Sequence, residues 1–250
     1  MKRTRIIFSA GLLVLTSTGA MASFDGQGYQ AQYQILAPDS ATPLGIYSIS
    51  QIWQPESKNW LQRGAISFRI KTLLTNYRYD YSDEVIYSGN KMLSYRLKEN
   101  DNGAVRQVTG ESDNVLPQLN LTLHGKKGKT QQSISNTDFD YTLFALRFPL
   151  PCDQHPVSGT KTSRIMTPMT GEIEPVQIRY LGYQPATFPG DTAPRSDRCL
   201  IEITSSNESM LSQSWMNAEG YLVYAIYPRY RLLLLPQVST LPHRSEEKSS

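Results

Sequence analysis

The two cysteines are the residues with the clearest chemical use. Cys152 and Cys199 are the only cysteines in the chain, and an isolated pair in an oxidising compartment is typical of a disulfide bond. The bond would close a loop of 199 − 152 = 47 residues, for which the chain-entropy model gives about 4 kcal/mol of stabilisation. A metal or redox pair is the alternative, but the CxxC spacing of such pairs is missing. We therefore predict a structural disulfide.

Other residue patterns give little support for catalysis or for a cofactor. No Gly-x-Ser-x-Gly elbow occurs, so the sequence lacks the main sign of an α/β-hydrolase. The segment 125–130, Gly-Lys-Lys-Gly-Lys-Thr, is two residues shorter than a phosphate loop and lies between strand-like segments. His124, His155 and His243 are not paired at ligand spacing, whereas zinc needs three or four convergent ligands. We expect no metal, no cofactor and no catalytic residue.

A pair of carboxylates flanks Phe139. Asp138 and Asp140 could supply a general acid and base. They also suit the first turn of a helix, where negative charge is favoured by the helix dipole. The second interpretation fits the residues that follow, so these aspartates carry no catalytic assignment.

The first 22 residues have the three parts of a secretory signal peptide. Lys2, Arg3 and Arg5 form a positive start, residues 6–15 form a short apolar core, and Ala20-Met21-Ala22 offers a cleavage site. The apolar core is shorter than the roughly 20 residues that span a bilayer. We therefore expect export to the periplasm, with extracellular release as the alternative, and no integral membrane segment in the mature chain.

Cleavage of the signal peptide changes the charge of the chain. The full sequence has 25 Lys and Arg against 22 Asp and Glu, and three of the basic residues lie in the signal peptide. The mature chain then has 25 − 3 = 22 basic and 22 acidic residues. A neutral chain has no overall electrostatic attraction for nucleic acid, so no nucleic-acid partner is expected.

Apolar residues alternate with polar ones over most of the remaining chain, which is typical of antiparallel strands. Asn100-Asp101-Asn102-Gly103 predicts a tight hairpin turn, because Asn-Gly tolerates positive φ. The predicted strands are 29–36, 45–53, 65–71, 76–83, 84–87, 92–98, 105–111, 119–123, 174–181, 198–205, 212–216, 221–227 and 230–235.

One amphipathic helix is expected in the middle of the chain. Thr137 would cap it, with Asp140 reaching back to the first turn. Helical spacing would then place Phe139, Leu143 and Leu146 on one face, and Pro149 would end the helix.

These elements predict a mainly β fold. Consecutive strands with a single helix favour a curved antiparallel sheet, an incomplete β-barrel or β-clam, with the helix as a plug or lid. The signal peptide (1–22) would be followed by one β-rich domain (23–241) and a disordered polar tail (242–250).

Aromatic residues are the main positive feature of the composition. The chain has fifteen tyrosines, and Tyr77, Tyr79 and Tyr81 would share one sheet face. Such a stripe is ordinary strand packing in one interpretation. In the other, the stripe lines a groove, since a tyrosine combines a large apolar ring with one polar hydroxyl.

Four short motifs carry a family resemblance. They are Tyr77-Arg78-Tyr79 with residues 84–89 and Leu93, then residues 99–103, then Thr170-Gly171-Glu172 with Val176 and residues 179–182, and finally residues 215–224. Together these motifs resemble a family of exported bacterial proteins described only as a domain of unknown function. That family is distantly similar to the periplasmic lipoprotein-carrier β-clams. The resemblance implies a curved antiparallel sheet with an apolar groove and supplies no catalytic residues.

Three hypotheses follow for the function. The first is a periplasmic binding or carrier protein for an apolar or lipid-like ligand, held between the face of Tyr77, Tyr79 and Tyr81 and the helix face of Phe139, Leu143 and Leu146. The second is a non-enzymatic accessory protein that adds a strand edge to an envelope assembly. The third is an envelope hydrolase, for which the sequence offers no nucleophile or metal site.

Overall fold

A computed structural model describes most of the chain after the predicted signal peptide. The described residues are 28–71, 76–89, 91–113, 115–126, 128–142, 159–205 and 210–241. The signal peptide (1–22), Cys152 and the tail (242–250) lie outside these ranges. Among the described residues, no helix is long and apolar enough to cross a membrane.

Within the described ranges, fifteen strands form one sheet. They are β1 (Tyr29–Leu36), β2 (Pro43–Gln54), β3 (Asn59–Lys71), β4 (Asn76–Ser88), β5 (Lys91–Asp101), β6 (Ala104–Ser112), β7 (Gln118–Gly125), β8 (Gly128–Ser135), β9 (Tyr141–Thr142), β10 (Thr160–Met166), β11 (Ile173–Tyr183), β12 (Cys199–Ser205), β13 (Met210–Met216), β14 (Leu222–Tyr227) and β15 (Tyr230–Leu234).

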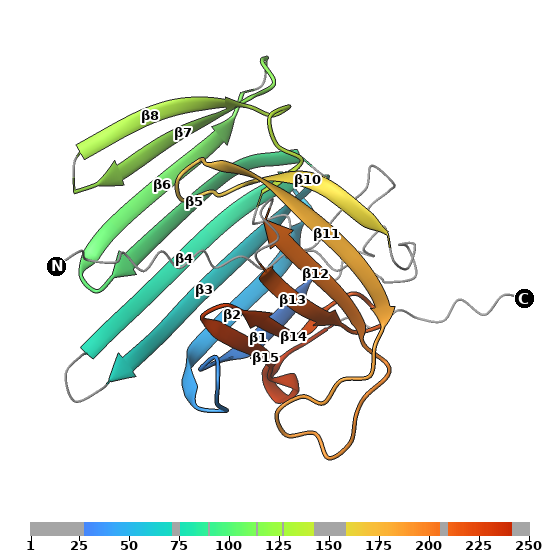
Figure 1. Ribbon diagram of the computed structural model, residues 1–250. Helices are drawn as coiled ribbons and strands as arrows, with labels where there is room; N and C mark the ends of the chain where they lie inside the picture. The colour runs from blue at the N-terminus through green and yellow to red at the C-terminus, as the bar shows by residue number, and fades with distance from the viewer. Residues whose placement is uncertain are drawn as a thin grey trace, which may run out of the picture.

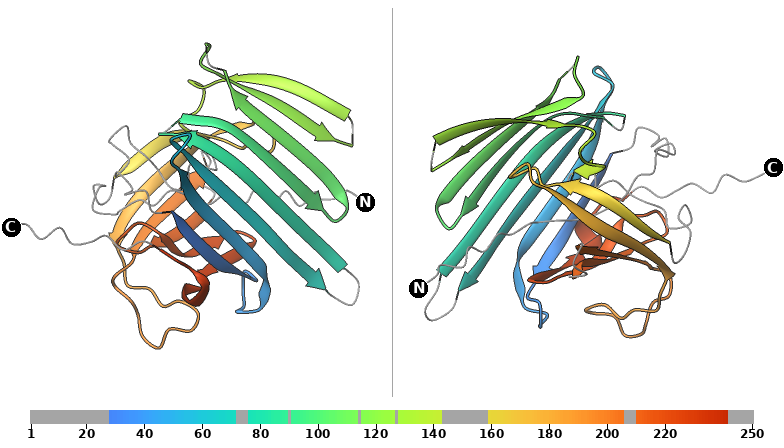
Figure 2. Two further views of the ribbon diagram at one scale, coloured as in Figure 1. Left: turned by 180° about the vertical axis from the view of Figure 1, so that it is seen from behind. Right: turned by 45° about the horizontal axis from the view of Figure 1, so that its top comes forward.

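The strand order shows how the sheet is built. It runs β8 to β1, then continues from β15 down to β9, so the first and last strands pair at its centre. All neighbours are antiparallel except the short β9, which is parallel to β10. The β10–β15 half lies across one side of the β1–β8 half (Figures 1 and 2). The predicted curved, unclosed antiparallel sheet is confirmed.

Buried and exposed residues alternate along the strands, which gives the sheet an inner and an outer face. In β4, Tyr79, Asp83, Val85 and Tyr87 are buried, while the residues between them are exposed or half-buried. The predicted Asn-Gly hairpin joins β5 to β6, with positive φ at Asn102 and Gly103. The Gly103 amide donates to Asn100 Oδ1 at 2.8 Å, which holds this turn in place.

The structure contradicts the expected start of the helix. Residues 137–140 form a turn, and the next two residues form β9. Asp140 accepts a hydrogen bond at Oδ2 from the Arg164 amide of β10 (2.7 Å), and its own amide donates to the Arg164 carbonyl (2.9 Å). Strand pairing therefore uses the groups that would have capped a helix. Within the described ranges the one helical element is a 3₁₀ turn, η3 (Pro236–Val238).

Leu143 and Leu146, the other predicted face residues of that helix, lie outside the described residues. The prediction of a plug or lid helix beginning at Thr137 is therefore wrong at its first turn. Nothing in the described chain takes the place of such a plug.

The inner face is packed as two apolar clusters. The larger one joins the two halves of the sheet, with Tyr33, Phe68 and Tyr79 from one half packed with Ile178 and Leu232 from the other. The smaller one lies on β4–β8, where the end of the β10–β11 hairpin covers it with Met166, Met169 and Ile173. Between β1–β2 and β11–β15, the protein's own side chains therefore form much of the interior.

Gly110 of β6 allows the β10–β11 hairpin to pack on the sheet. A Cβ on Gly110 would lie 2.0 Å from Cε1 of Tyr95, so the bare backbone makes room for the ring. The Tyr95 hydroxyl then donates to the Pro168 carbonyl at 2.9 Å, in the turn between β10 and β11. The Tyr95–Gly110 contact thus fixes how the second half of the sheet meets the first.

Gly110→Ala should therefore destabilise the fold. The added methyl group displaces the Tyr95 ring, and overpacking of this kind costs about 1–3 kcal/mol. Gly125→Ala is the matched control, because a Cβ there meets nothing within 4 Å. Urea unfolding measures both variants, and equal free energies of unfolding for the two would contradict the packing described here.

Candidate functional site

The predicted tyrosine stripe lies on the inner face of β4, but its members differ in burial. Tyr79 is 2% exposed and belongs to the larger core cluster. Tyr77 and Tyr81 are half-buried and pack against that cluster, and Tyr81 also packs against the smaller one. Tyr79 is thus a core residue, whereas Tyr77 and Tyr81 lie at the margin of the core.

The other predicted wall of the groove was the helix face of Phe139, Leu143 and Leu146, of which the structure describes only Phe139. Phe139 is half-buried and packs against the smaller cluster, to which Tyr81 also contributes. Phe139 therefore lies near one end of the stripe without facing Tyr77 or Tyr79 in the same cluster.

A buried carboxylate is the most unusual group on the inner face. Glu99 of β5 is 2% exposed. Its Oε1 accepts a hydrogen bond from the Tyr79 hydroxyl (3.0 Å), and its Oε2 accepts one from Arg106 Nε of β6 (2.5 Å). A buried charge is tolerated only when it is paired and hydrogen-bonded, and both conditions are met here. Burial and the Glu99 carboxylate raise the pKa of Tyr79 above its ordinary value.

Further buried polar residues lie on the inner face of β2, β3 and β4. Gln51 and Gln62 face each other on β2 and β3, and Gln51 Nε2 donates to Gln62 Oε1 at 2.9 Å. Asp83 of β4 is 6% exposed and lies between Gly64 and Leu97 in the register. We call Gln51, Gln62, Asp83 and Glu99 the inner polar band. Sequence reasoning missed the band, although polar residues at inward positions of an alternating strand were its visible signal.

A charged margin lies at one end of the inner face. Tyr77 lies near Asp101, the last residue of β5, and near Arg229, in the turn between β14 and β15. Burial and the Asp101 carboxylate raise the pKa of Tyr77, while Arg229 acts in the opposite direction. Half-buried Ile70 faces Tyr77 in the register, and half-buried Tyr81 lies on the same face of β4 beyond Tyr79. We call Ile70, Tyr77, Tyr81, Asp101 and Arg229 the inner margin. It combines apolar rings with one acid and one base drawn from both halves of the sheet.

The remaining residues with chemical potential are scattered. Cys199 is 1% exposed at the start of β12, and the predicted Cys152–Cys199 disulfide stays a prediction because Cys152 lies outside the described residues. His124 is exposed at the end of β7, and the other two histidines are not described. Across the described ranges, no group of three or more histidine, cysteine or acidic residues is placed to hold a metal ion.

Tyr79→Phe should lower the free energy of unfolding by about 1–3 kcal/mol, because Glu99 then loses a hydrogen bond inside the core. Tyr183→Phe removes a hydroxyl from a tyrosine that is 50% exposed and serves as the control. Chemical denaturation of both variants measures the effect. Equal stability of the two would show that the Glu99 network does not stabilise the fold.

Alkaline pH should unfold the protein cooperatively. Burial raises the pKa of Tyr33, Tyr95 and Tyr230 above the ordinary value of 10.0. A raised pKa means that the folded state keeps its protons more tightly, so this stability is complete below pH 10 and is lost as pH rises further. Near-ultraviolet tyrosinate absorbance and circular dichroism should change together for these residues. Tyrosinate formation by them near pH 10 in a folded protein would contradict their burial.

Residues 33–228 match the model of a domain of unknown function, DUF6134. The match runs from β1 to the turn after β14 and therefore includes both halves of the sheet. No curated protein and no solved structure matches the chain. Because the match covers most of the sequence, the chain belongs to the DUF6134 family.

Proposed function

We propose that the protein is an exported, non-enzymatic binding or carrier protein for an amphiphilic ligand of the cell envelope. The observation that carries the proposal is the inner margin, where half-buried Ile70 and Tyr77 lie beside Asp101 and Arg229 and half-buried Tyr81 follows on the same face of β4. Sites for small ligands commonly combine an apolar lining with a few polar groups that fix orientation.

The apolar rings and the charged residues of the inner margin would bind different parts of the ligand. An acyl chain would cover the exposed parts of the Tyr77 and Tyr81 rings and remove apolar surface from water. A polar head group would meet Arg229 or Asp101, which come from opposite halves of the sheet. Because the core clusters occupy the interior beside the margin, the ligand would lie along their edge.

The Glu99 network supports binding over catalysis. Both oxygens of Glu99 already accept hydrogen bonds, from Tyr79 and Arg106. A general base must also lie within reach of its substrate, and Glu99 is only 2% exposed. We propose that Glu99 stabilises the inner face beside the ligand and does not contact the ligand.

Export and the disulfide belong to the same proposal. Cleavage after Ala22 would leave Ser23 as the first residue of a periplasmic protein. The oxidising compartment would then join Cys152 to buried Cys199. The intact mass of the secreted protein, before and after reduction and alkylation, checks both features.

A second function is favoured by one observation at the edge of the sheet. β8 is an outermost strand, and its first six residues are all exposed. An edge strand of this length can accept an extended segment of another protein through main-chain hydrogen bonds. An accessory role in an envelope assembly would use this edge and leave the inner margin unoccupied.

Binding of a fluorescent apolar probe tests the carrier proposal. The exported, disulfide-containing protein should bind N-phenylnaphthylamine, and dodecanoate should displace it. Tyr77→Ser and Tyr81→Ser should each weaken binding about tenfold, because loss of a partly buried ring costs on the order of 1.4 kcal/mol. Tyr183→Ser, at an exposed position on β11, is the control.

The same preparation gives a second measurement. Organic extraction and mass spectrometry should find a lipid-like compound bound to the purified protein. The absence of both an extracted compound and probe binding would overturn the carrier proposal. A stoichiometric protein partner captured by crosslinking through β8 would then favour the accessory function.

A further inference from the structure

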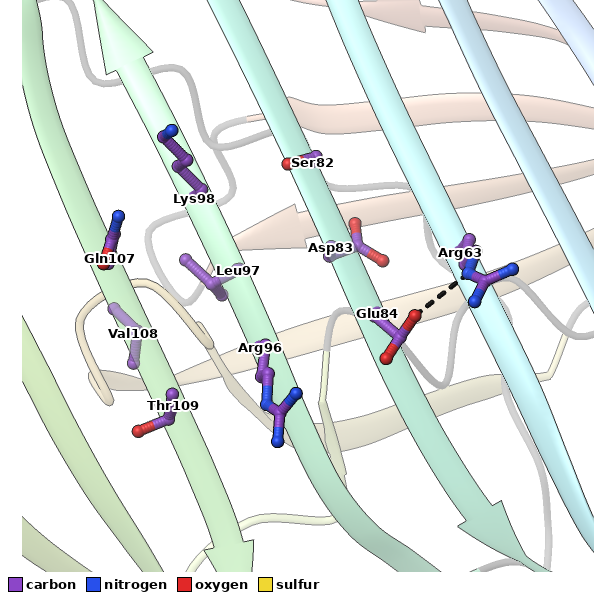
Figure 3. Close-up of a pocket in the computed structure, with 10 residues that line it drawn as sticks. All are labelled: Arg63, Ser82, Asp83, Glu84, Arg96, Leu97, Lys98, Gln107, Val108 and Thr109. Atoms are coloured by element: carbon purple, nitrogen blue, oxygen red, sulfur yellow. Dashed lines mark hydrogen bonds and ion pairs between the residues drawn. The ribbon is translucent and has the colours of Figure 1, made fainter.

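A shallow depression hollows the outer face of the sheet over β3–β6, on the side away from the inner margin. Its volume is about 450 Å³. Figure 3 shows Arg63, Glu84 and Arg96 next to one another across β3, β4 and β5. Asp83 belongs to the opposite, inner face of β4 and is 6% exposed. The side chains that line the outer surface of the depression are Arg63, Ser82, Glu84, Arg96, Lys98, Gln107 and Thr109.

Two cations in the depression are not paired with any described residue. Arg63 Nε donates to Glu84 Oε2 at 3.0 Å, which neutralises that pair. Arg96 and Lys98 form no ion pair or side-chain hydrogen bond within the described ranges, and both are exposed on β5. Arg96 faces Glu84 in the register, but that carboxylate is paired with Arg63, so the charges of Arg96 and Lys98 are available to a ligand.

The surrounding outer face is also positive. The outer face presents two acids, Asp80 and Glu84, and each is paired with an arginine. This count covers residues 63–71 of β3, 78–84 of β4 and 96–98 of β5. Six basic against two acidic side chains give a local charge of 6 − 2 = +4, whereas the predicted mature chain is neutral overall. The basic residues are Arg63, Arg69, Lys71, Arg78, Arg96 and Lys98.

Neutral polar groups accompany the cations in the same cross-strand rows. Thr109 faces Arg96, and both Ser82 and Gln107 face Lys98. Their hydroxyl and amide groups can both donate and accept hydrogen bonds. A ligand that matches the depression therefore carries negative charge and many hydroxyl groups.

We propose that this outer depression binds an acidic saccharide, a sugar chain that carries carboxylate groups. Arg96 and Lys98 hold the carboxylates, and Ser82, Gln107 and Thr109 bind the sugar hydroxyls. A flat bilayer surface fits less well, because its phosphates would meet protruding cations and would not reach hydroxyl and amide groups in a hollow. The depression is open to solvent, so a sugar chain longer than the site can extend beyond it.

Isothermal titration of the exported protein with oligogalacturonate tests the proposal. Binding should weaken with salt, because exposed charges are screened. Arg96→Gln combined with Lys98→Gln should reduce the affinity at least tenfold without changing the free energy of unfolding. Lys126→Gln combined with Lys129→Gln removes the same charge from the β7–β8 hairpin and should leave the affinity unchanged.

Four outcomes would overturn the proposal. They are no binding of oligogalacturonate, equal weakening by both double variants, equally tight binding of inorganic phosphate, and preferential binding to phosphatidylglycerol vesicles. Equal weakening would indicate a general response to net charge. The inner-margin ligand is measured with an uncharged probe at different residues, so either proposal can fail while the other holds.

Discussion

Pairing of the first strand with the last is the constraint on which the rest of the structure depends. Leu36 of β1 faces Arg231 of β15, and Tyr33 faces Leu234. Arg231 of β15 supports this seam by donating from Nε to the Ala37 carbonyl (3.1 Å) and from Nη2 to the Ser40 carbonyl. The Tyr33 hydroxyl of β1 donates to the Leu222 carbonyl of β14 (3.2 Å), which also joins the two halves. Without the seam, the chain would form two separate meanders, each with an unpaired apolar strand at its edge.

The seam also gives the two faces of the sheet different chemistry. It bends the halves toward each other, so their inner faces share one core and the inner polar band must be satisfied internally. None of the described residues covers the outer face of β3–β6 in this way, and its cations are exposed. One side of the same strands therefore suits an apolar guest at its margin, and the other side suits an anion. This separation explains how a mature chain that is predicted to be neutral overall can present two distinct surfaces.

Local strand structure was largely predictable from the sequence, whereas the arrangement of strands was not. Alternation located β1 within its observed bounds, and Asn102-Gly103 predicted the β5–β6 turn. The sequence suggested a break at Asp83, but β4 continues through it because the inner polar band accepts an inward carboxylate. β8 was missed because its polar residues show no apolar alternation.

The errors at the site have a common physical origin. Capping signals at Thr137 and Asp140 are local, and a partner strand far along the chain overrode them through Arg164. The roles of Glu99 and Arg229 likewise depend on which strands meet, which no spacing along the sequence reveals. The tyrosine stripe was placed on the correct kind of face, yet only packing across the seam separates buried Tyr79 from its half-buried neighbours.

The central claim is that the edge of the inner face binds an amphiphilic guest. Backbone NMR of the isotope-labelled mature protein, recorded with increasing monododecanoylglycerol, an uncharged amphiphile, tests it most directly because each amide reports separately. The account predicts saturable shifts at residues 70, 77, 81 and 101 and in the β14–β15 turn, with the outer depression unaffected. Shifts confined to the outer face or to β8, or no saturable shift at all, would contradict it.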